Sequence, residues 1–318
     1  MKDRYGRSIN YLRLSVTDRC NLRCRYCMPS EGILKENHSD ILSFEEICEI
    51  VRVFVKTGVD KIRLTGGEPL VRKKLPNLIA AIRRENTIRD FSITTNGILL
   101  KQVAKDIMDA GISRINISLD SMKPDKFHRI TQRGNLKDVL DGIAEVRKLG
   151  FHPIKINTVL IKGFNDDEIG DFIDLTRNED IEVRFIELMP LFNNWEYNKS
   201  HYMANTEVIE RYPELIPVTC SDRSSTALKY AVPGYLGKVG LINPNSHKFC
   251  SSCNRVRITA DGKMKTCLHS DQEIDLKACL RNNIAMEEVI RKNIFLKPSD
   301  HKLETGKYVM RSMSAIGG

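Results

Sequence analysis

The sequence predicts an α/β fold in which about six strand–helix units form a curved, largely parallel sheet, followed by a smaller α+β extension. Between residues 9 and 188, short strand-like segments alternate with helical patterns, and such alternation is typical of parallel βαβ units. The strand-like segments also alternate apolar with polar side chains, so each strand should have one apolar and one polar face. The expected strands are Ile9–Val16, Lys61–Thr65, Phe91–Asn96, Arg114–Leu119, Pro153–Leu160 and Ile181–Leu188.

The ends of several helices can also be predicted from the sequence. Ser43 and Glu46 form a capping box, which predicts a helix that begins there and stops near Gly58. Gly111 and Gly150 are expected to end two later helices, because glycine readily adopts the left-handed conformation that follows many helices. These helices fall between expected strands, as βαβ connections require.

The polar faces of the strands carry charged side chains, which bears on the shape of the sheet. In the first strand, Leu12 and Leu14 alternate with Arg13 and Ser15. Helices can cover the apolar faces, but the polar faces need water or a polar ligand, because buried polar groups without partners are costly. An open sheet with one solvated face would meet this need. We favour an incomplete TIM-type barrel with helices outside and a hydrophilic lumen, because charged side chains recur on the polar face.

The pattern changes after about residue 190. Residues 190–240 carry no recognisable motif. Further on, Arg255–Ala260 and Lys263–Cys267 are predicted to form a hairpin, because Asp261-Gly262 between them favours a tight turn. Two short helices are expected after the hairpin, near Leu276–Arg281 and Met286–Lys292.

Length and composition limit the possible classes of protein. The 318 residues allow one large domain or two, and we divide them into a barrel core, residues 1–200, and a C-terminal region, residues 201–318. The fractions of hydrophobic (41%) and charged (29%) residues exclude a collagen-like or disordered chain. Neither a membrane-spanning apolar run nor a secretory signal is present in the sequence, so we expect a cytoplasmic protein without a membrane partner.

The net charge of +9 suits an anionic partner, either a nucleic acid or a phosphorylated small molecule. Because the basic residues are spread along the chain, we favour the small molecule.

Nine cysteines are present, and six of them form two triplets, one near each end of the chain. An odd number of cysteines without a secretory signal argues against a disulfide framework. Clustered thiols in a reducing compartment usually hold metal. The other three, Cys48, Cys220 and Cys279, receive no role.

The first triplet, Cys20, Cys24 and Cys27, lies in a loop after the first strand. Three thiolates without a local fourth ligand suit a four-iron cluster that leaves one iron open to a non-protein ligand. A zinc site completed by a distant residue such as His38 is the alternative.

With Tyr26 before its last cysteine, this C-x3-C-x2-C motif resembles that of the radical S-adenosylmethionine superfamily. The segment Gly66-Gly67-Glu68-Pro69 after the second strand strengthens the resemblance. The resemblance implies a 4Fe-4S cluster and S-adenosylmethionine, with Gly67 near the methionine amino group. It also implies that Tyr26, Ser118 and Met189 contact this cofactor, and that the chemistry proceeds by single electrons.

The second triplet consists of Cys250, Cys253 and Cys267. Its spacing also suits a zinc ribbon with His247 or His269 as the fourth ligand. Arg255 and Arg257 follow directly; two residues apart on a strand, they would share a face. Such a pair suits bidentate phosphate binding, although a solvated strand face would look the same.

The run Cys-x2-Cys-Asn-Arg-x-Arg, the later Cys267 and the terminal Gly317-Gly318 together resemble the GTP 3′,8-cyclase family, over essentially the whole chain. The resemblance implies a second 4Fe-4S cluster on Cys250, Cys253 and Cys267, whose open iron binds the guanine edge of GTP. It implies that Thr94 contacts GTP and that Arg255, Arg257, Gly317 and Gly318 act in catalysis. The cations expected to face the lumen, and so to bind the triphosphate, are Arg13, Arg63, Lys155, Arg255 and Arg257, with Arg184 as a possible sixth.

The implied activity is that of a lyase, the cyclisation of GTP to (8S)-3′,8-cyclo-7,8-dihydroguanosine 5′-triphosphate, the first step of molybdenum cofactor biosynthesis. The resemblance further implies a homodimer, an electron donor and transfer of the product to the next enzyme. Two alternatives stay open. One is a different radical S-adenosylmethionine enzyme that modifies a peptide; the other is a zinc-stabilised nucleic-acid-binding protein.

Overall fold

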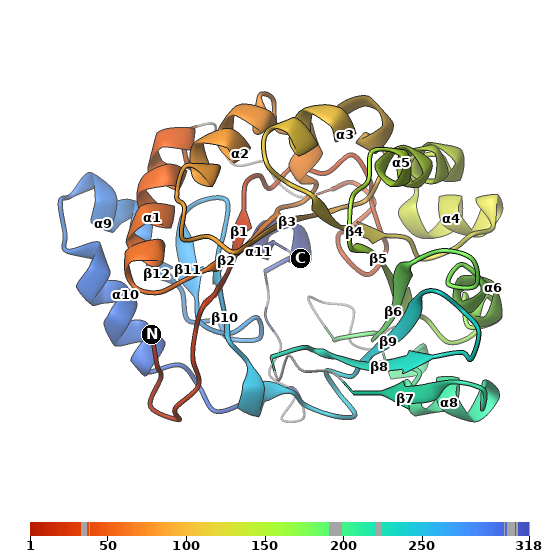
Figure 1. The fold of residues 1–318 in the computed structure, drawn as a ribbon. Coiled ribbons are helices and arrows are strands. Elements are labelled where there is room, and N and C mark those ends of the chain that lie inside the picture. Colours follow the sequence, from red (N-terminus) through yellow and green to blue (C-terminus); the bar gives the residue numbers. More distant parts are fainter. Residues whose placement is uncertain are drawn as a thin grey trace.

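The computed structural model describes residues 1–32, 37, 39–190, 199–219, 224–301, 303, 309 and 311–317. His38, Cys220 and Gly318, which the sequence analysis considered, lie outside these residues. Figure 1 shows a curved sheet with helices on its convex side and the C-terminal segment inside the curve.

The sheet has twelve strands in the order β12-β11-β10-β1-β2-β3-β4-β5-β6-β9-β8-β7. Its parallel part runs from β10 to β9, and the strands beyond them pair antiparallel. Among the described residues the end strands β12 and β7 do not pair with each other, which confirms an incomplete barrel. The strands are β1 (Tyr11–Ser15), β2 (Lys61–Thr65), β3 (Asp90–Thr95), β4 (Arg114–Ser118), β5 (Ile154–Leu160), β6 (Ile181–Glu187), β7 (Ile216–Val218), β8 (Ala227–Ala231), β9 (Lys238–Ile242), β10 (Arg255–Ile258), β11 (Lys263–Lys265) and β12 (Ile274–Asp275).

Most helices cover the outer side of the sheet, whereas the short C-terminal helix α11 lies inside the curve (Figure 1). In α1 the expected capping box is present: Ser43 Oγ accepts from Glu46 N at 3.1 Å and Glu46 Oε2 accepts from Ser43 N at 2.9 Å. The helices are α1 (Phe44–Lys56), α2 (Leu75–Arg83), α3 (Leu100–Asp109), α4 (Pro124–Thr131), α5 (Leu136–Lys148), α6 (Ile169–Asp174), α8 (Thr206–Arg211), α9 (Leu276–Arg281), α10 (Met286–Phe295) and α11 (Met313–Ile316), with short 3-10 turns η1 (Pro69–Val71) and η2 (Cys250–Ser252).

The hydrophobic core lies between the sheet and the helices. Leu12, Leu14 and Ile62 project from the strands and are fully buried, as are Ile50 and Phe54 of α1. Burying one such side chain contributes about 1.5–3 kcal/mol. The apolar face of each strand therefore packs in the core, and the polar face lines the space inside the curved sheet.

Both ends of the parallel sheet are completed by the C-terminal part of the chain. Strand β10 pairs parallel with β1, and β9 pairs parallel with β6. The expected hairpin is present, since Arg257 of β10 lies opposite Lys265 of β11. The sheet is continuous across the division at residue 200, and the assignment of two domains stays a prediction.

Candidate functional site

A cavity of about 530 Å³ occupies the interior of the curved sheet. All six cysteines of the two triplets line it, although the triplets are more than two hundred residues apart in sequence. The other sequence-predicted residues that line it are Arg13, Tyr26, Arg63, Gly67, Thr94, Ser118, Lys155, Arg184, Met189, Arg255 and Arg257. The fold therefore brings both cysteine motifs and the expected cations to one cavity.

The loop that carries the first triplet is held by backbone hydrogen bonds. Arg23 N and Arg25 N donate to the carbonyls of Thr131 and Ile130, at the end of α4, at 2.8 and 3.1 Å. Within the loop, Cys27 N donates to the carbonyl of Cys24 at 2.8 Å, which turns the chain between these two ligands. The loop is thereby fixed at the carboxyl ends of the barrel strands, where barrel enzymes build their sites.

The environment of the first triplet disfavours free thiolates. Burial raises the pKa of Cys20 to about 11 and that of Cys27 to about 12. The pKa of Cys24 is raised well above its usual value by burial and then by the charge of Asp120. Thiols in this position ionise when a cation is bound to them. Three thiols that line one cavity and raise the pKa of one another fit an iron–sulfur cluster.

Tyr26, between two of these cysteines, forms a hydrogen bond that sequence reasoning missed. Its hydroxyl donates to Asp120 Oδ2 at 2.7 Å, and Asp120 Oδ1 accepts from Val159 N at 2.9 Å. Burial raises the pKa of Asp120 to about 6. The feature of the sequence that could have indicated a role for Asp120 is its position, two residues beyond Ser118 and just past the end of β4.

The Gly66-Gly67-Glu68 segment packs against the backbone that leads to the first triplet. A Cβ on Gly67 would lie 2.4 Å from the carbonyl oxygen of Arg19, so only glycine fits there. Glu68 is buried, and its carboxylate accepts hydrogen bonds from Thr95 Oγ1 at 2.7 Å and from Asn96 N at 2.6 Å. Burial raises the pKa of Glu68 to about 7. The glycines therefore position the cysteine loop as well as lining the cavity.

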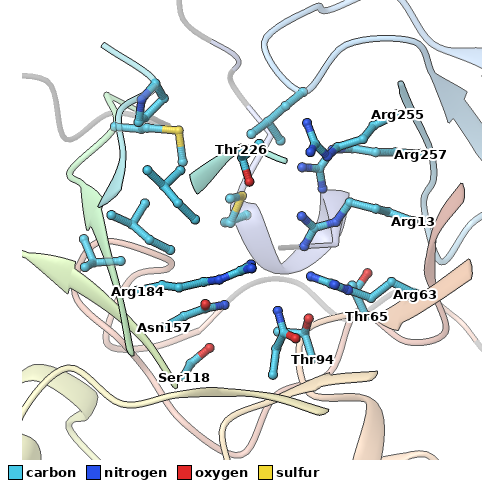
Figure 2. A pocket seen from close by; sticks show the side chains of 18 of the residues that line it. Arg13, Arg63, Thr65, Thr94, Ser118, Asn157, Arg184, Thr226, Arg255 and Arg257 are labelled. Atoms are coloured by element: carbon cyan, nitrogen blue, oxygen red, sulfur yellow. The ribbon is translucent and has the colours of Figure 1, made fainter. Parts of the chain in front are cut away.

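Arginines form a row across three neighbouring strands. The parallel register places Arg257 of β10 beside Arg13 of β1, and Arg13 beside Arg63 of β2. Figure 2 shows these three side chains, with Arg255 and Arg184, pointing toward a common space. Burial and then the charges of Arg257 and Arg63 lower the pKa of Arg13 well below its usual value, and burial lowers the pKa of Arg257 to about 10. So many buried cations fit a polyanionic ligand.

On the opposite side of the cavity, cations surround one carboxylate. Glu182 forms ion pairs with Arg184 at 2.5 Å, Lys155 at 3.4 Å and Lys229 at 3.5 Å. Although burial alone would raise the pKa of Glu182, Arg184 and Lys155 bring it down to about 2. Burial and then Arg184 lower the pKa of Lys155 to about 8. Lys155 and Arg184 were predicted from the sequence, whereas Glu182 and Lys229 become recognisable only once the register of β5 with β6 and the position of β8 are known.

Several buried polar atoms on the lining point to a polar ligand. Thr65 Oγ1, Thr94 Oγ1, Asn116 Nδ2 and Asn157 Oδ1 have no hydrogen-bond partner among the described residues. Thr65, Thr94 and Asn157 face the same space as the arginines in Figure 2. Because buried polar groups are nearly always paired, these atoms fit a ligand with several donors and acceptors.

The second triplet lies in more cationic surroundings. Cys250 begins the turn η2, and Cys253 N donates to the carbonyl of Cys250 at 3.2 Å. Burial raises the pKa of Cys250. Burial also acts to raise the pKa of Cys253, but the charges of Lys297 and Arg255 outweigh it, and that pKa is lowered.

The histidines considered as zinc ligands lie in different places. His247 is exposed, whereas His269 lines the cavity and packs edge-on against His301, with ring centroids 5.0 Å apart. Burial lowers the pKa of His269 to about 3. Within the described ranges, no group of three His, Cys, Asp or Glu side chains is arranged to hold a single metal ion.

The C-terminal segment enters the cavity from α11. The Gly317 carbonyl accepts a hydrogen bond from Arg257 Nη1 at 2.5 Å. With φ of 86°, Gly317 leaves no room for a side chain, because a Cβ would lie 2.7 Å from Thr65 Oγ1. One residue of the predicted tail is therefore placed at the arginine row, while Gly318 lies outside the described residues.

Two family models match this chain in succession. The model described as "Radical SAM superfamily" matches residues 14–176, and the one described as "Molybdenum Cofactor Synthesis C" matches residues 181–303. The first match covers the end of β1, strands β2 to β5 and the first triplet; the second covers strands β6 to β12 and the second triplet.

Curated relatives match over the whole length. A GTP 3′,8-cyclase of Peptoclostridium acidaminophilum is 51% identical over 99% of this chain and 98% of its own length. Another, of Alkaliphilus oremlandii (strain OhILAs), is 50% identical over 100% of both chains.

Among solved structures, Streptococcus suis SuiB bound to S-adenosylmethionine matches with a TM-score of 0.58 over 89% of this chain and 68% of that chain. At 14% identity this likeness concerns the fold alone. The full-length identity and the two family models are more specific. This chain belongs to the radical S-adenosylmethionine superfamily and, within it, to the GTP 3′,8-cyclase family.

Proposed function

We propose that this protein is a GTP 3′,8-cyclase that uses S-adenosylmethionine and two 4Fe-4S clusters. The observation that carries the proposal is that one cavity is lined by both cysteine triplets and by a row of arginines. Membership of the cyclase family supports the same activity. The proposed reaction joins ribose C3′ to C8 of guanine within one GTP molecule.

The first triplet would hold the cluster that S-adenosylmethionine contacts. Tyr26, Gly67, Ser118 and Met189 line the cavity and would orient the cofactor. When bound, this cluster and S-adenosylmethionine supply the one-electron chemistry that removes a hydrogen atom from the substrate. The enclosing sheet would keep water away from the reacting atoms.

The second triplet, Cys250, Cys253 and Cys267, would hold the second cluster and place the guanine beside it. The triphosphate carries about four negative charges, which buried cations must offset. Those proposed to bind it are Arg13, Arg63, Lys155, Arg184, Arg255 and Arg257. Thr94 would supply a hydrogen bond through its unpartnered Oγ1.

The C-terminal glycines would complete the site. Arg257 holds the carbonyl of Gly317, so the segment and the phosphate-binding row are linked. We assign Arg255, Arg257, Gly317 and Gly318 to catalysis on this basis and on the family resemblance. An extra residue added after Gly318 should abolish cyclisation while leaving the iron content unchanged.

The wider setting is also proposed. The protein would act as a cytoplasmic homodimer that receives electrons from a separate donor and passes its product to the next enzyme of molybdenum cofactor synthesis. We propose neither a nucleic-acid nor a membrane partner. In the described residues no helix is both long enough and apolar enough to cross a membrane.

The deciding experiment is anaerobic reconstitution followed by incubation with S-adenosylmethionine, a reductant and GTP. We expect about eight irons per chain, release of deoxyadenosine that depends on GTP, and a cyclised nucleotide identified by mass spectrometry. A Cys48→Ala variant serves as a control for loss of a cysteine to which no role is assigned. Two zinc ions per chain, or deoxyadenosine release that depends on a peptide and not on GTP, would refute the proposal.

A further inference from the structure

One buried lysine connects two of the segments that carry the second triplet. Lys297 directly follows Leu296, the C-cap residue of α10, and is 2% exposed. Its Nζ donates to the carbonyl of Arg255 at 3.0 Å and to the carbonyl of Thr266. Arg255 stands two residues after Cys253, and Thr266 stands directly before Cys267. One ammonium group therefore links the backbone beside these two cysteines, in addition to the pairing of β10 with β11.

A buried arginine from the other end of the chain holds the third segment. Arg7 Nη1 donates to the carbonyl of Cys250 at 2.8 Å. The same guanidinium donates to the carbonyls of Pro298 at 2.5 Å and Ser299 at 2.8 Å, which immediately follow Lys297. Arg7 thus binds the backbone of Pro298 and Ser299, the two residues that follow Lys297. Together, Arg7 and Lys297 contact the backbone at or beside all three cysteines.

The two cations differ in how their charge is balanced. Arg7 forms an ion pair with Asp3, with Nε 2.5 Å from Oδ2. Lys297 makes no ion pair with a carboxylate among the residues that the structure describes. A buried ammonium without a counter-charge is costly. The cations that act on Cys253 are Lys297, Arg255 and Arg7, so the second triplet is where negative charge would balance Lys297.

We propose that Lys297 and Arg7 are positioning residues that form a clamp behind the second triplet. The clamp fixes the spacing of Cys250, Cys253 and Cys267 and offsets the negative charge of a cluster bound to them. This inference rests on the proposed function only in requiring that the second triplet holds a 4Fe-4S cluster.

Loss of the lysine charge has two consequences. The carbonyls of Arg255 and Thr266 lose a buried donor, so the segments that carry Cys253 and Cys267 lose the link beside these two cysteines and are joined only through the β10–β11 pairing further along. The reduced cluster, which carries one more negative charge than the oxidised one, loses a neighbouring cation. The second cluster should then bind less tightly and have a more negative reduction potential.

The test uses the reconstituted full chain and compares Lys297→Met with the conservative Lys297→Arg. The matched control is Lys292→Met, which removes an exposed lysine of α10. A Cys250→Ala variant shows the behaviour of the protein without the second cluster. The measurements are iron per chain, the rate of iron loss to a chelator, and the midpoint potential of each cluster by titration monitored with electron paramagnetic resonance.

We expect Lys297→Met to lose iron from the second site about tenfold faster than the wild type, until about four irons per chain remain. Any second cluster that survives should have a more negative midpoint potential, while the first cluster is unchanged. Lys297→Arg should behave closer to the wild type, and Lys292→Met should equal it.

Two results would overturn the inference. One is a Lys297→Met protein with about eight stable irons and an unchanged second potential; the other is a wild type that never binds more than about four. If Lys297→Met does not fold, the same iron-loss assay is applied to Arg7→Lys. This variant keeps the positive charge but loses hydrogen-bond donors of the clamp, so it too should lose iron from the second site faster than the wild type. A wild type with about eight irons that does not cyclise GTP would refute the proposed function and leave the clamp testable.

Discussion

The two cysteine triplets line the same cavity but lie in opposite electrostatic surroundings. The charges of Asp120 and Glu68 act on the first triplet, and after burial they raise the pKa of Cys24 and Cys20. Lys297 and Arg255 act on the second, where they lower the pKa of Cys253. Cations of the chain therefore favour the thiolate at Cys253, although burial raises the pKa of Cys250, whereas the thiols of the first triplet would need a bound cation to ionise.

This difference matches the charges of the two proposed ligands. S-adenosylmethionine carries a sulfonium and an ammonium group, so a cavity wall with Asp120 and Glu68 suits it. GTP carries a triphosphate, and the arginine row beside the second triplet suits that. The part of the cavity beside the first triplet is thus complementary to S-adenosylmethionine, and the part beside the second triplet is complementary to GTP. The triphosphate of GTP would lie along the arginine row.

The largest expected effects come from removing one cysteine from each triplet. Cys24→Ala should abolish both deoxyadenosine release and cyclisation, because the cofactor loses its electron source. Cys253→Ala should abolish cyclisation but keep about half of the iron and a measurable cleavage of S-adenosylmethionine. Both are measured by chromatography of the nucleosides and by iron analysis. If Cys24→Ala and Cys253→Ala lost deoxyadenosine release and cyclisation to the same extent, the proposed difference in role between the two triplets would be wrong.

A smaller but still large effect is expected at Gly317, which contacts Arg257 in the arginine row. In Gly317→Ala the new Cβ would lie 2.7 Å from Thr65 Oγ1, on a backbone with φ of 86°. Displacing this segment should reduce kcat about 100-fold, because small misplacements of site residues are costly. Iron content at both triplets should not change. Gly163→Ala, with a similar φ of 73° and nothing within 4 Å of the added Cβ, is the matched control.

A conservative substitution in the arginine row is expected to weaken the binding of GTP. Arg257→Lys keeps a positive charge but removes the planar fork that donates to Gly317 and faces the cavity. We expect about a 30-fold weaker affinity for GTP, by equilibrium binding, and no change in iron content. A loss of iron from the second triplet would mean that Arg257 supports the cluster and not the triphosphate.

The smallest effect is a dependence of GTP binding on pH. Lys155 has a pKa lowered to about 8 by burial and Arg184, so it is charged below that pH and neutral above it. Affinity for GTP should therefore fall about fivefold between pH 7 and pH 9 at constant ionic strength. Lys155→Met should bind more weakly at pH 7 and show a flatter profile. Iron content at each triplet should be the same at both pH values.

Much of the barrel could be predicted from the sequence because its signals are local. The alternation in Lys61–Thr65 gave the bounds of β2, and the capping box at Ser43 gave the start of α1. Each depends on neighbouring residues only. Strands β7 to β9 were not assigned, because they lie where periodicity is weak and because β9, which connects them to the sheet, pairs with the distant β6.

The candidate site was predicted in part. Alternation along single strands indicated that Arg13, Arg63 and Lys155 would face the lumen, where they are found. Two acidic residues, Asp120 beside Tyr26 and Glu182 beside Lys155, received no role, because their partners come from other segments of the chain. Lys297 was missed for a related reason, because nothing local distinguishes it from the exposed Lys292.

By itself the sequence determined the type of chemistry, because thiol spacing and strand alternation are set within a few residues and do not depend on the rest of the chain. Only the tertiary structure decided which charges surround each triplet. The pairing of β10 with β1 places Arg257 beside Arg13, and the segment after α10 carries Lys297 to Cys253. Electrostatic surroundings act through space, so residues dozens of positions apart determine the properties of cysteines that look alike in sequence.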